Sequence, residues 1–260
     1  MFVTRRRVIV LLIGLLSSFL LIACDQSSPT ANTGAVPSEA QLAAYRERVA
    51  ALRDKAERIK DVNDIKRLQR SFGYYFDAGQ WDDMAALFAD NATLEYARDG
   101  VYVGKQRIRD YFYALGDGKA GLKQGQLNEH FQIMPVITLS ADGTSAQARW
   151  RDLSLQGQYG KTALWGEGPY ENEYVKDNGV WKISKLHWFQ TILVPYDGGW
   201  YKNEDYNKGL YVSDTLPPDK PPTTDDGYWP TTYLPPFHFD NPVATYRGEG
   251  SEGQNEQKGK

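Results

Sequence analysis

The sequence predicts an α+β fold in which helices pack on one face of a strongly curved antiparallel sheet. Helical periodicity dominates up to about residue 115, and long alternating strands follow from about residue 128. A third observation is the pair Asn178-Gly179, which favours a tight turn between the last two strands. Beyond residue 195 the composition changes to a segment rich in proline and aromatic residues.

The first 23 residues have the features of an export signal, because three arginines at positions 5–7 precede an apolar run at 8–21. That run is marginal for a permanent span, which needs about 20 apolar residues. The sequence Leu21-Ile22-Ala23-Cys24 resembles the bacterial lipobox. The resemblance implies a lipid anchor on Cys24 in the cell envelope. Asp25 follows the cysteine, and the resemblance to enteric lipoprotein sorting rules implies that it favours the periplasmic side of the inner membrane over the outer membrane. An uncleaved anchor and an ordinary signal peptide are the alternatives.

Residues 24–37 are small and polar and predict a flexible tether. Residues 38–60 predict an amphipathic helix. This helix is expected to lie on its own domain, and a short coiled-coil seam is the alternative. A second helix is expected over 62–78, capped by Asp61 or Asn63. The apolar positions of the first helix are Leu42, Tyr45, Val49, Leu52, Ala56 and Ile59.

The remaining elements form a domain expected over residues 61–195. A short helix over 81–88 is followed by a hairpin of 93–96 with 101–103, and then by a helix over 105–115. Four strands are expected over 131–139, 145–156, 163–175 and 181–194. Residues 196–247 hold many prolines but also many aromatic residues, so they predict an ordered, irregular extension that wraps the domain or a neighbouring subunit. A disordered tail is expected over 248–260.

Composition excludes several classes of function. The formal net charge is -3, and no basic stripe indicates nucleic-acid binding. Cys24 is the only cysteine, so a lipidated chain keeps no thiol for catalysis, disulfides or metal binding. The sequence has no phosphate-binding glycine loop, no nucleophile elbow and no histidine pair at metal-ligand spacing. We therefore expect neither a cofactor nor a metal.

Residues 65–92 resemble the opening of SnoaL-like proteins of the nuclear transport factor 2-like superfamily. The stretch Gly104-Lys105-Gln106-Arg107-Ile108 resembles the family's turn into its third helix, and residues 177–184 resemble its last hairpin. The resemblance covers roughly residues 60–195 and implies a cone-shaped α+β barrel. It also implies a dimer or trimer, with the extension as a possible clasp.

The dehydrating and dehydrohalogenating members of this superfamily place an Asp late in the first domain helix and a His early in a following strand. Asp77 and His130 stand at the matching positions. A carboxylate that binds one imidazole nitrogen fixes the tautomer and stabilises the imidazolium formed when the other nitrogen takes a proton. A helix cap at Gly79 and an ordinary strand histidine are the alternatives.

Further pocket residues follow from the same resemblance. Tyr74 is expected in the cavity, where its hydroxyl would polarise the leaving group, and Tyr75 and Trp81 are expected near it. Trp188 is expected to form a wall, and His187 would join it only if a bulge turned it inward. Leu186 stands where the dehydrochlorinase has an arginine, so chloride departure is poorly supported. His238 could close the mouth of the cone.

The function expected from these residues is cofactor-independent elimination of water or formaldehyde from a small, hydrophobic, aromatic hydroxylated substrate. His130 would be the base, Asp77 would position it, and Tyr74 would assist the leaving oxygen. The alternative is a lipoprotein that uses the same cone to bind a hydrophobic ligand or to support an envelope complex, without catalysis.

Overall fold

A computed structural model describes residues 36–197 and 212–223. The expected export signal, Cys24, most of the expected tether and extension, His238 and the expected tail lie outside these ranges. Within the described ranges, no helix is both long enough and apolar enough to cross a membrane. The chain divides into two units, Met1–Val49 and Ala50–Lys260.

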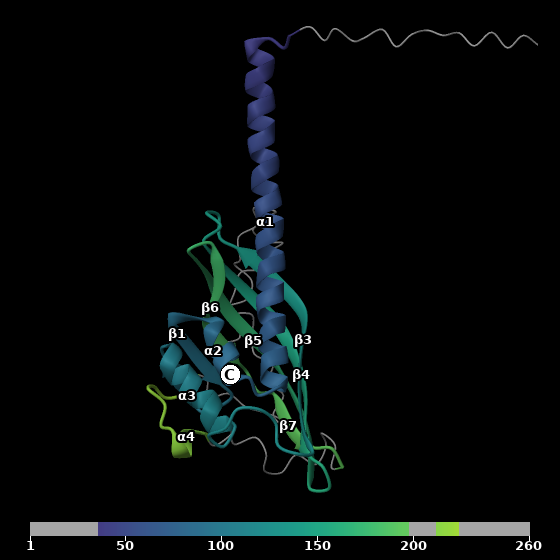
Figure 1. Cartoon of the computed structure of the whole chain (residues 1–260), viewed down its shortest axis with the longest axis vertical. Coiled ribbons are helices and arrows are strands. Elements are labelled where there is room, and N and C mark those ends of the chain that lie inside the picture. Colours follow the sequence, from purple (N-terminus) through teal and green to yellow (C-terminus); the bar gives the residue numbers. More distant parts are fainter. Residues whose placement is uncertain (1–35, 198–211, 224–260) are drawn as a thin grey trace, which may run out of the picture. The chain divides into compact units, whose positions relative to one another are not determined.

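The elements follow the predicted order of helices before strands (Figure 1). The N-terminal half contains α1 (Glu39–Asp77), α2 (Trp81–Ala86), β1 (Phe88–Tyr96), β2 (Val101–Val103) and α3 (Lys105–Leu115). The long strands are β3 (Gln126–Leu139), β4 (Ser145–Gln158), β5 (Thr162–Asp177) and β6 (Val180–Trp188). The described residues end with β7 (Ile192–Pro195) and α4 (Val212–Thr215).

The seven strands form one curved, unclosed sheet in the order β2-β1-β6-β5-β4-β3, with β7 paired to β5. The predicted antiparallel meander is confirmed for β3 to β6. The sheet as a whole is mixed, because β1 and β6 run parallel. The chain crosses through α3 to the far edge of the sheet and returns through three hairpins, so β6 reaches β1 pointing in the same direction.

Two turn features explain where the last strands begin and end. Asn178 and Gly179 both adopt positive φ, at 49° and 81°, which confirms the tight turn between β5 and β6. The single strand expected over 181–194 is wrong, because the chain leaves β6 after Trp188 and crosses Gly168. A Cβ on Gly168 would lie 2.0 Å from the carbonyl oxygen of Phe189, so only glycine fits under this crossing.

The break predicted between two helices near residue 61 is also wrong, because α1 is continuous. Asp61 is not a helix cap. It is buried, pairs with Lys176 Nζ at 2.6 Å and accepts a hydrogen bond from Trp181 Nε1 at 2.9 Å. These tertiary contacts satisfy its carboxylate within the helix.

The apolar face of the N-terminal part of α1 was expected to pack on the domain. Leu52 and Ile59 on this face are 57% and 64% exposed, so the expectation is wrong for these two residues. The coiled-coil alternative stays a prediction.

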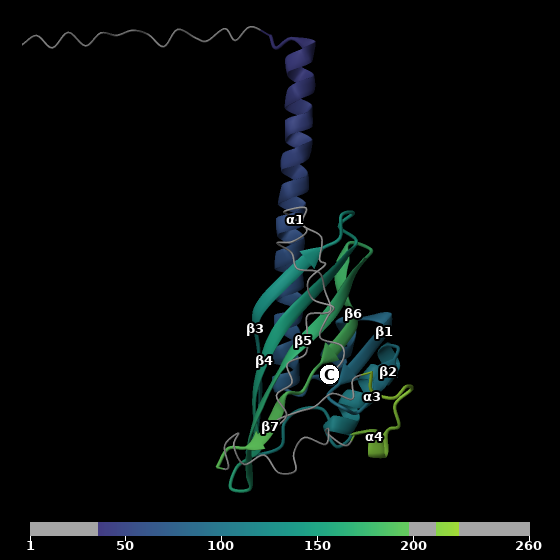
Figure 2. The same ribbon diagram turned by 180° about the vertical axis from the view of Figure 1, so that it is seen from behind.

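The C-terminal part of α1 lies across one face of the sheet, in front of β5 in Figure 1 and behind it in Figure 2. Phe72 stands at the centre of the aromatic core and makes edge contacts with Phe76, Phe88, Phe112 and Tyr170. A Cβ on Gly73 would lie 2.9 Å from Gln132 Cγ and 3.0 Å from the carbonyl oxygen of His130. Glycine at this position therefore allows α1 to lie directly against β3.

The described part of the extension, residues 212–223, binds the edge formed by β1 and β2. Val101 and Lys220 form an isolated β-bridge, and Tyr102 donates its hydroxyl to the carbonyl oxygen of Leu216 at 2.8 Å. The Thr223 backbone N–H donates to Glu95 Oε1 at 2.6 Å. This short segment is held by the domain. Wrapping by the rest of the extension stays a prediction.

Candidate active site

Asp77 and His130 meet where the last turn of α1 lies against β3. The His130 backbone N–H donates to Asp77 Oδ1 at 2.7 Å, and the ring Nδ1 lies 3.3 Å from the same oxygen. The backbone bond fixes the carboxylate, and the carboxylate then faces one side of the imidazole. The fold thus brings together two residues that are 53 positions apart in the sequence.

The surroundings of His130 favour a neutral imidazole with its proton on Nδ1. The side chain is fully buried, and burial lowers the pKa of His130 below its usual 6.5, although Asp77 opposes this shift. The ring stacks on Phe76 at 3.9 Å between centroids and an interplanar angle of 6°. With Nδ1–H directed at Asp77, Nε2 keeps its lone pair and is the available base.

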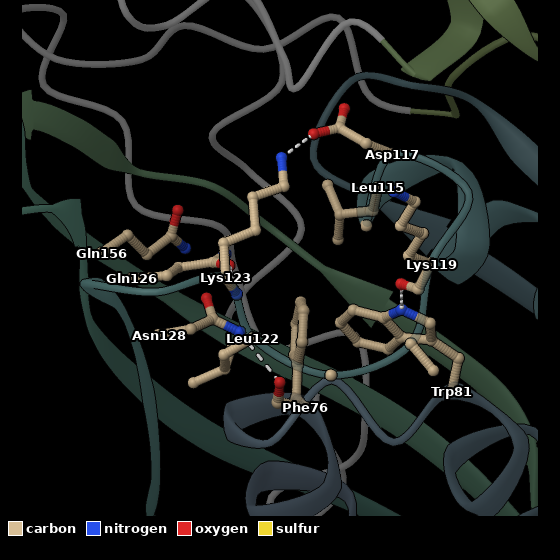
Figure 3. Close-up of a pocket in the computed structure, with 13 residues that line it drawn as sticks. Phe76, Trp81, Leu115, Asp117, Lys119, Leu122, Lys123, Gln126, Asn128 and Gln156 are labelled. Carbon is tan, nitrogen blue, oxygen red and sulfur yellow. Dashed lines mark hydrogen bonds and ion pairs between the residues drawn. The ribbon is translucent and has the colours of Figure 1, made fainter.

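The amide of Gln156, on β4, forms a hydrogen bond with the lone pair of His130 Nε2. Its Nε2 lies 3.1 Å from His130 Nε2, an arrangement in which the amide donates to the neutral ring. Gln156 also lines a pocket of about 220 Å³, in which Figure 3 shows its side chain, so this one residue contacts both His130 Nε2 and the pocket.

The pocket combines aromatic walls with amide groups. Figure 3 shows the Phe76 ring beside the indole of Trp81, which donates from Nε1 to the carbonyl oxygen of Lys119 at 2.8 Å. Asn128 Nδ2 donates to the carbonyl oxygen of Phe76 at 2.8 Å. The remaining wall comes from the segment after α3, in which Lys123 forms an ion pair with Asp117. The Trp81 side chain therefore borders this pocket.

A second pocket of about 250 Å³ lies between α1 and β3. It is bordered by Tyr74, Asp77 and His130, among others. Asp77 and His130 border only this second pocket. Phe76, which stacks on the imidazole, and Gln156, whose amide lies 3.1 Å from Nε2, border the first.

The expected position of Tyr74 is wrong. Its side chain is 74% exposed and borders only the second, outer pocket, whereas Tyr75 is partly buried and packs against the aromatic core. On α1 the inward positions are Ile65, Phe72 and Phe76, and Tyr74 points away from this row. Tyr74 is therefore not placed to assist a leaving group inside the cone.

Trp188 and His187 lie on opposite faces of β6. Trp188 is buried in the interior and stacks on Tyr96 at 4.5 Å, but it borders neither pocket near the dyad. His187 is also buried, stacks on Phe189 at 3.7 Å and lies 3.6 Å from Glu95 Oε1. Leu186 is part of the hydrophobic core. His187 therefore does not join His130.

Sequence reasoning missed the polar residues of β4 that face the interior. Trp150 is buried in the core, and the two-residue period of a strand places Asp152, Ser154 and Gln156 on the same face. Asp152 and Ser154 are both fully buried. The signal in the sequence was the change from apolar to polar residues along this one alternating face.

Within residues 36–197 and 212–223, no group of three or more His, Cys, Asp or Glu side chains is arranged to hold a metal ion. The described site therefore consists of one imidazole, carboxyl groups, amides and aromatic rings.

Solved structures with a similar fold include several from species of Novosphingobium. A candidate scytalone dehydratase from Novosphingobium aromaticivorans is 20% identical, with 55% of this chain and 91% of that chain covered and a TM-score of 0.48. A hexachlorocyclohexane dehydrochlorinase from Novosphingobium barchaimii is 19% identical, with 55% and 95% covered and a TM-score of 0.48. A protein of unknown function from Mycobacterium tuberculosis is 17% identical, with 54% and 76% covered and a TM-score of 0.45.

The match to a family model is independent of these structures. The model of the SnoaL-like domain matches residues 57–187, half of the chain. These residues include the C-terminal part of α1, the hairpin of β1 and β2, α3 and the strands β3 to β6, and so they contain both Asp77 and His130. The chain belongs to the SnoaL-like domain family.

Proposed function

We propose that this protein is a cofactor-independent lyase in which His130 removes a proton from carbon and Asp77 positions His130. The observation that carries the proposal is the contact of one Asp77 oxygen with both the backbone N–H and the ring Nδ1 of His130. Such a carboxylate holds the imidazole in the tautomer that leaves Nε2 basic.

The chemistry follows from the two ring nitrogens. Nε2 takes a proton from a carbon next to an activating group, and the imidazolium that forms is stabilised by the Asp77 carboxylate at Nδ1. The electron pair of the broken C–H bond forms a double bond, and a neighbouring oxygen substituent leaves. This step releases water when a C–O bond breaks. For release of formaldehyde, Nε2 instead takes the hydroxyl proton of a CH2OH group, the O–H electron pair forms the C=O bond of formaldehyde, and the C–C bond breaks; the electron pair of that bond forms the C=C bond as a hydroxyl group leaves the next carbon as water.

The proposed substrate is small, hydrophobic and aromatic, with a hydroxyl group. The pocket next to Gln156 offers the rings of Phe76 and Trp81 for stacking and the amide of Asn128 for a polar group. Its volume of about 220 Å³ fits a single substituted ring better than a polycyclic compound. Leu186, a core residue, offers no positive charge for a departing chloride, so an oxygen leaving group is favoured.

The test uses Asp77→Asn and His130→Gln with a panel of aromatic β-hydroxy ketones and lignin-type aromatic alcohols. Each substitution is expected to lower kcat about 10²- to 10⁴-fold, because each removes base catalysis and keeps side-chain volume. Asp82→Asn is the matched control, because Asp82 is an aspartate in an exposed ion pair with Arg109 and should leave kcat unchanged. Activity that survived in both dyad variants would refute the mechanism.

A ligand-binding protein without catalysis is the second candidate, and one observation favours it. The interior is densely filled by fully buried aromatic side chains, among them Trp150, Trp188, Tyr96, Tyr170, Phe72 and Phe112. In that case isothermal titration should detect tight binding of an aromatic compound that His130→Gln leaves intact, and the panel should show no turnover.

Lipid anchoring and self-association complete the proposal. We propose a lipid on Cys24, with the domain on the periplasmic side of the inner membrane favoured, because residues 1–24 match an export signal with a lipobox. Cys24→Ser should move the protein from the membrane fraction to the soluble fraction.

A homodimer or homotrimer is supported by apolar side chains exposed on β3, namely Leu127, Phe131, Ile133, Met134 and Val136. Light scattering of the delipidated protein would measure its mass.

A further inference from the structure

The side chains on the inward face of β4 change from apolar to polar along the strand. Ala148 and Trp150 pack in the hydrophobic core, and Asp152 and Ser154 continue the same face as buried polar residues. In the register of the sheet, Ser154 pairs with His130 and Asp152 pairs with Gln132. The polar half of this face therefore begins at the pair Asp152–Gln132 and includes the next pair on the same face, Ser154–His130, which contains the proposed base.

Asp152 is buried without enough partners. Its side chain is 0% exposed, Oδ1 accepts one hydrogen bond from Gln132 Nε2 at 3.3 Å, and Oδ2 has no partner among the described residues. Ser154 Oγ and Trp188 Nε1 are also buried and without a hydrogen-bond partner in that part of the chain. Native proteins rarely leave such groups unsatisfied. Asp152 and Ser154 lie on the same face of β4, and two unsatisfied groups on one face indicate a place that is completed by a bound polar group.

The Asp152 carboxyl group is set up as a proton donor rather than as an anion. Burial raises the pKa of Asp152 well above its usual 3.8, and the negative charges of Glu167 and Asp77 raise it further. Two tyrosines next to it, Tyr96 and Tyr170, also have their pKa raised by burial, with the charge of Asp152 as the second cause. Burial and the two neighbouring negative charges act in the same direction, so they favour the neutral form of the Asp152 carboxyl group over the ionised form.

The separation of Asp152 and His130 suits two groups that act on one small molecule. The residues are diagonal neighbours on paired strands, a relation that places their Cβ atoms roughly 7–8 Å apart. Both side chains are buried on the inner face of the sheet, as Ser154 between them is. This distance is too long for direct contact, so a group that contacts both side chains has to lie between them, beside Ser154. Neither Asp152 nor Ser154 borders the two pockets described above.

We propose that Asp152 is the general acid of the elimination and donates its proton to the leaving hydroxyl group while His130 removes the proton from carbon. The inference rests on the proposed function and specifies its leaving group. The C–H bond breaks toward His130 Nε2, its electron pair forms the C=C bond, and the C–O bond breaks toward oxygen. That oxygen takes the Asp152 proton and departs as water. His130 gains one proton and Asp152 loses one, so the product water can return the proton and restore both groups.

Entry to this space passes Gln156. Its amide lies between the pocket of Figure 3 and His130 Nε2, and it is the next inward residue of β4 after Ser154. A hydroxyl-bearing carbon that displaces this amide reaches the basic nitrogen and the unpaired oxygen of Asp152 from the same side. The aromatic part of the substrate would then stay in the pocket beside Phe76 and Trp81.

The test compares two leaving groups on one carbon skeleton. The aldol adduct of benzaldehyde and acetone loses water, which needs an acid, whereas its acetate ester loses acetate, which does not. Asp152→Asn keeps the shape of the side chain but cannot give up a proton. We expect it to lower kcat at least about 10²-fold for the hydroxy ketone and less than about five-fold for the acetate. His130→Gln should lower kcat for both compounds.

Asp99→Asn is the matched control, because Asp99 is another buried aspartate and accepts a hydrogen bond from Tyr111 instead. It should leave the ratio of the two rates unchanged. If Asp152→Asn lowered kcat equally for both compounds, or for neither, Asp152 would not be the general acid. The proposed function would still stand. A native protein that eliminates neither leaving group would contradict the proposed function itself, and the inference with it.

Asp152→Leu is a second variant in case the asparagine form does not fold. It removes the acid together with its unpaired oxygen, so it leaves fewer buried polar groups unsatisfied. Circular dichroism would verify the fold, and the same selective loss on the hydroxy ketone is expected. A folded leucine variant with full activity on that compound would refute the inference.

Discussion

Asp61 and Asp152 are both buried aspartates, but the protein treats them in opposite ways. Asp61, on α1, pairs with Lys176 and accepts a hydrogen bond from Trp181. Burial alone would raise its pKa, but these two partners outweigh burial and lower it. Asp152, on β4, has one long hydrogen bond from Gln132 and one oxygen without a partner among the described residues, and burial raises its pKa.

The difference separates a carboxyl group that supports the fold from one that we propose to take part in the reaction. A buried charge with two good partners joins α1 to β5 and β6 and holds the helix in place. A buried acid with an unused oxygen contributes nothing comparable to stability, so its presence is better explained by a ligand. The two residues therefore predict different consequences when the carboxyl group is removed.

The largest expected effect is on how stability depends on pH. The folded state keeps a proton on Asp152 that the unfolded chain loses above about pH 4, so native stability should fall as pH rises through this range. Asp152→Asn removes this pH dependence. The unfolding free energy of the variant, relative to that of the native protein, should therefore rise by at most about 1.4 kcal/mol per pH unit. Urea denaturation at about pH 4, 6 and 8 would measure this. Parallel curves for the two proteins would contradict it.

Asp61→Ala should cost about 3 kcal/mol at neutral pH, because it leaves Lys176 and Trp181 without their partner. The lowered pKa of Asp61 means that its contribution is present above about pH 4 and is lost as pH falls further. Asp64→Ala is the control on the same helix, since its pair with Lys60 is exposed and should contribute little. Equal losses of unfolding free energy in the two variants would show that Asp61 is not structural.

The smallest expected effect concerns the base itself. Gln156 donates to neutral His130, so Gln156→Leu should favour the protonated ring and raise the pKa of His130. The acid limb of the pH–rate profile should therefore move to higher pH. Gln158→Leu is a suitable control, because Gln158 lies on the same strand and donates to the carbonyl oxygen of Gln124 instead. An unchanged acid limb would remove Gln156 from contact with the working base.

Local signals predicted most of the fold. The helix over 105–115 and the hairpin of 93–96 with 101–103 lie within β1, β2 and α3 as found, because glycine turns mark their ends. The predictions failed where distant residues decide. Asp61 has the chemistry of a helix cap, and only its contacts with Lys176 and Trp181 show why the helix continues. The end of β6 after Trp188 likewise depends on the crossing over Gly168.

The candidate site was predictable only in part. Asp77 and His130 were chosen by resemblance, and the structure places them in contact. Tyr74 was chosen over Tyr75 without knowledge of the direction in which each side chain leaves the helix, and its exposed position excludes it from the interior. Asp152 was overlooked because its importance depends on burial and on an unused oxygen, neither of which a single sequence displays.

Gly73 gives the site a strict spacing rule. It is the point at which α1 touches β3, and Asp77 follows it by four residues, about one helical turn, so both lie on the same side of the helix. Deleting one residue between them would keep the helix but rotate Asp77 by about 100° away from His130. Engineered or natural variants of this protein should therefore tolerate many substitutions in this turn while tolerating no change in its length.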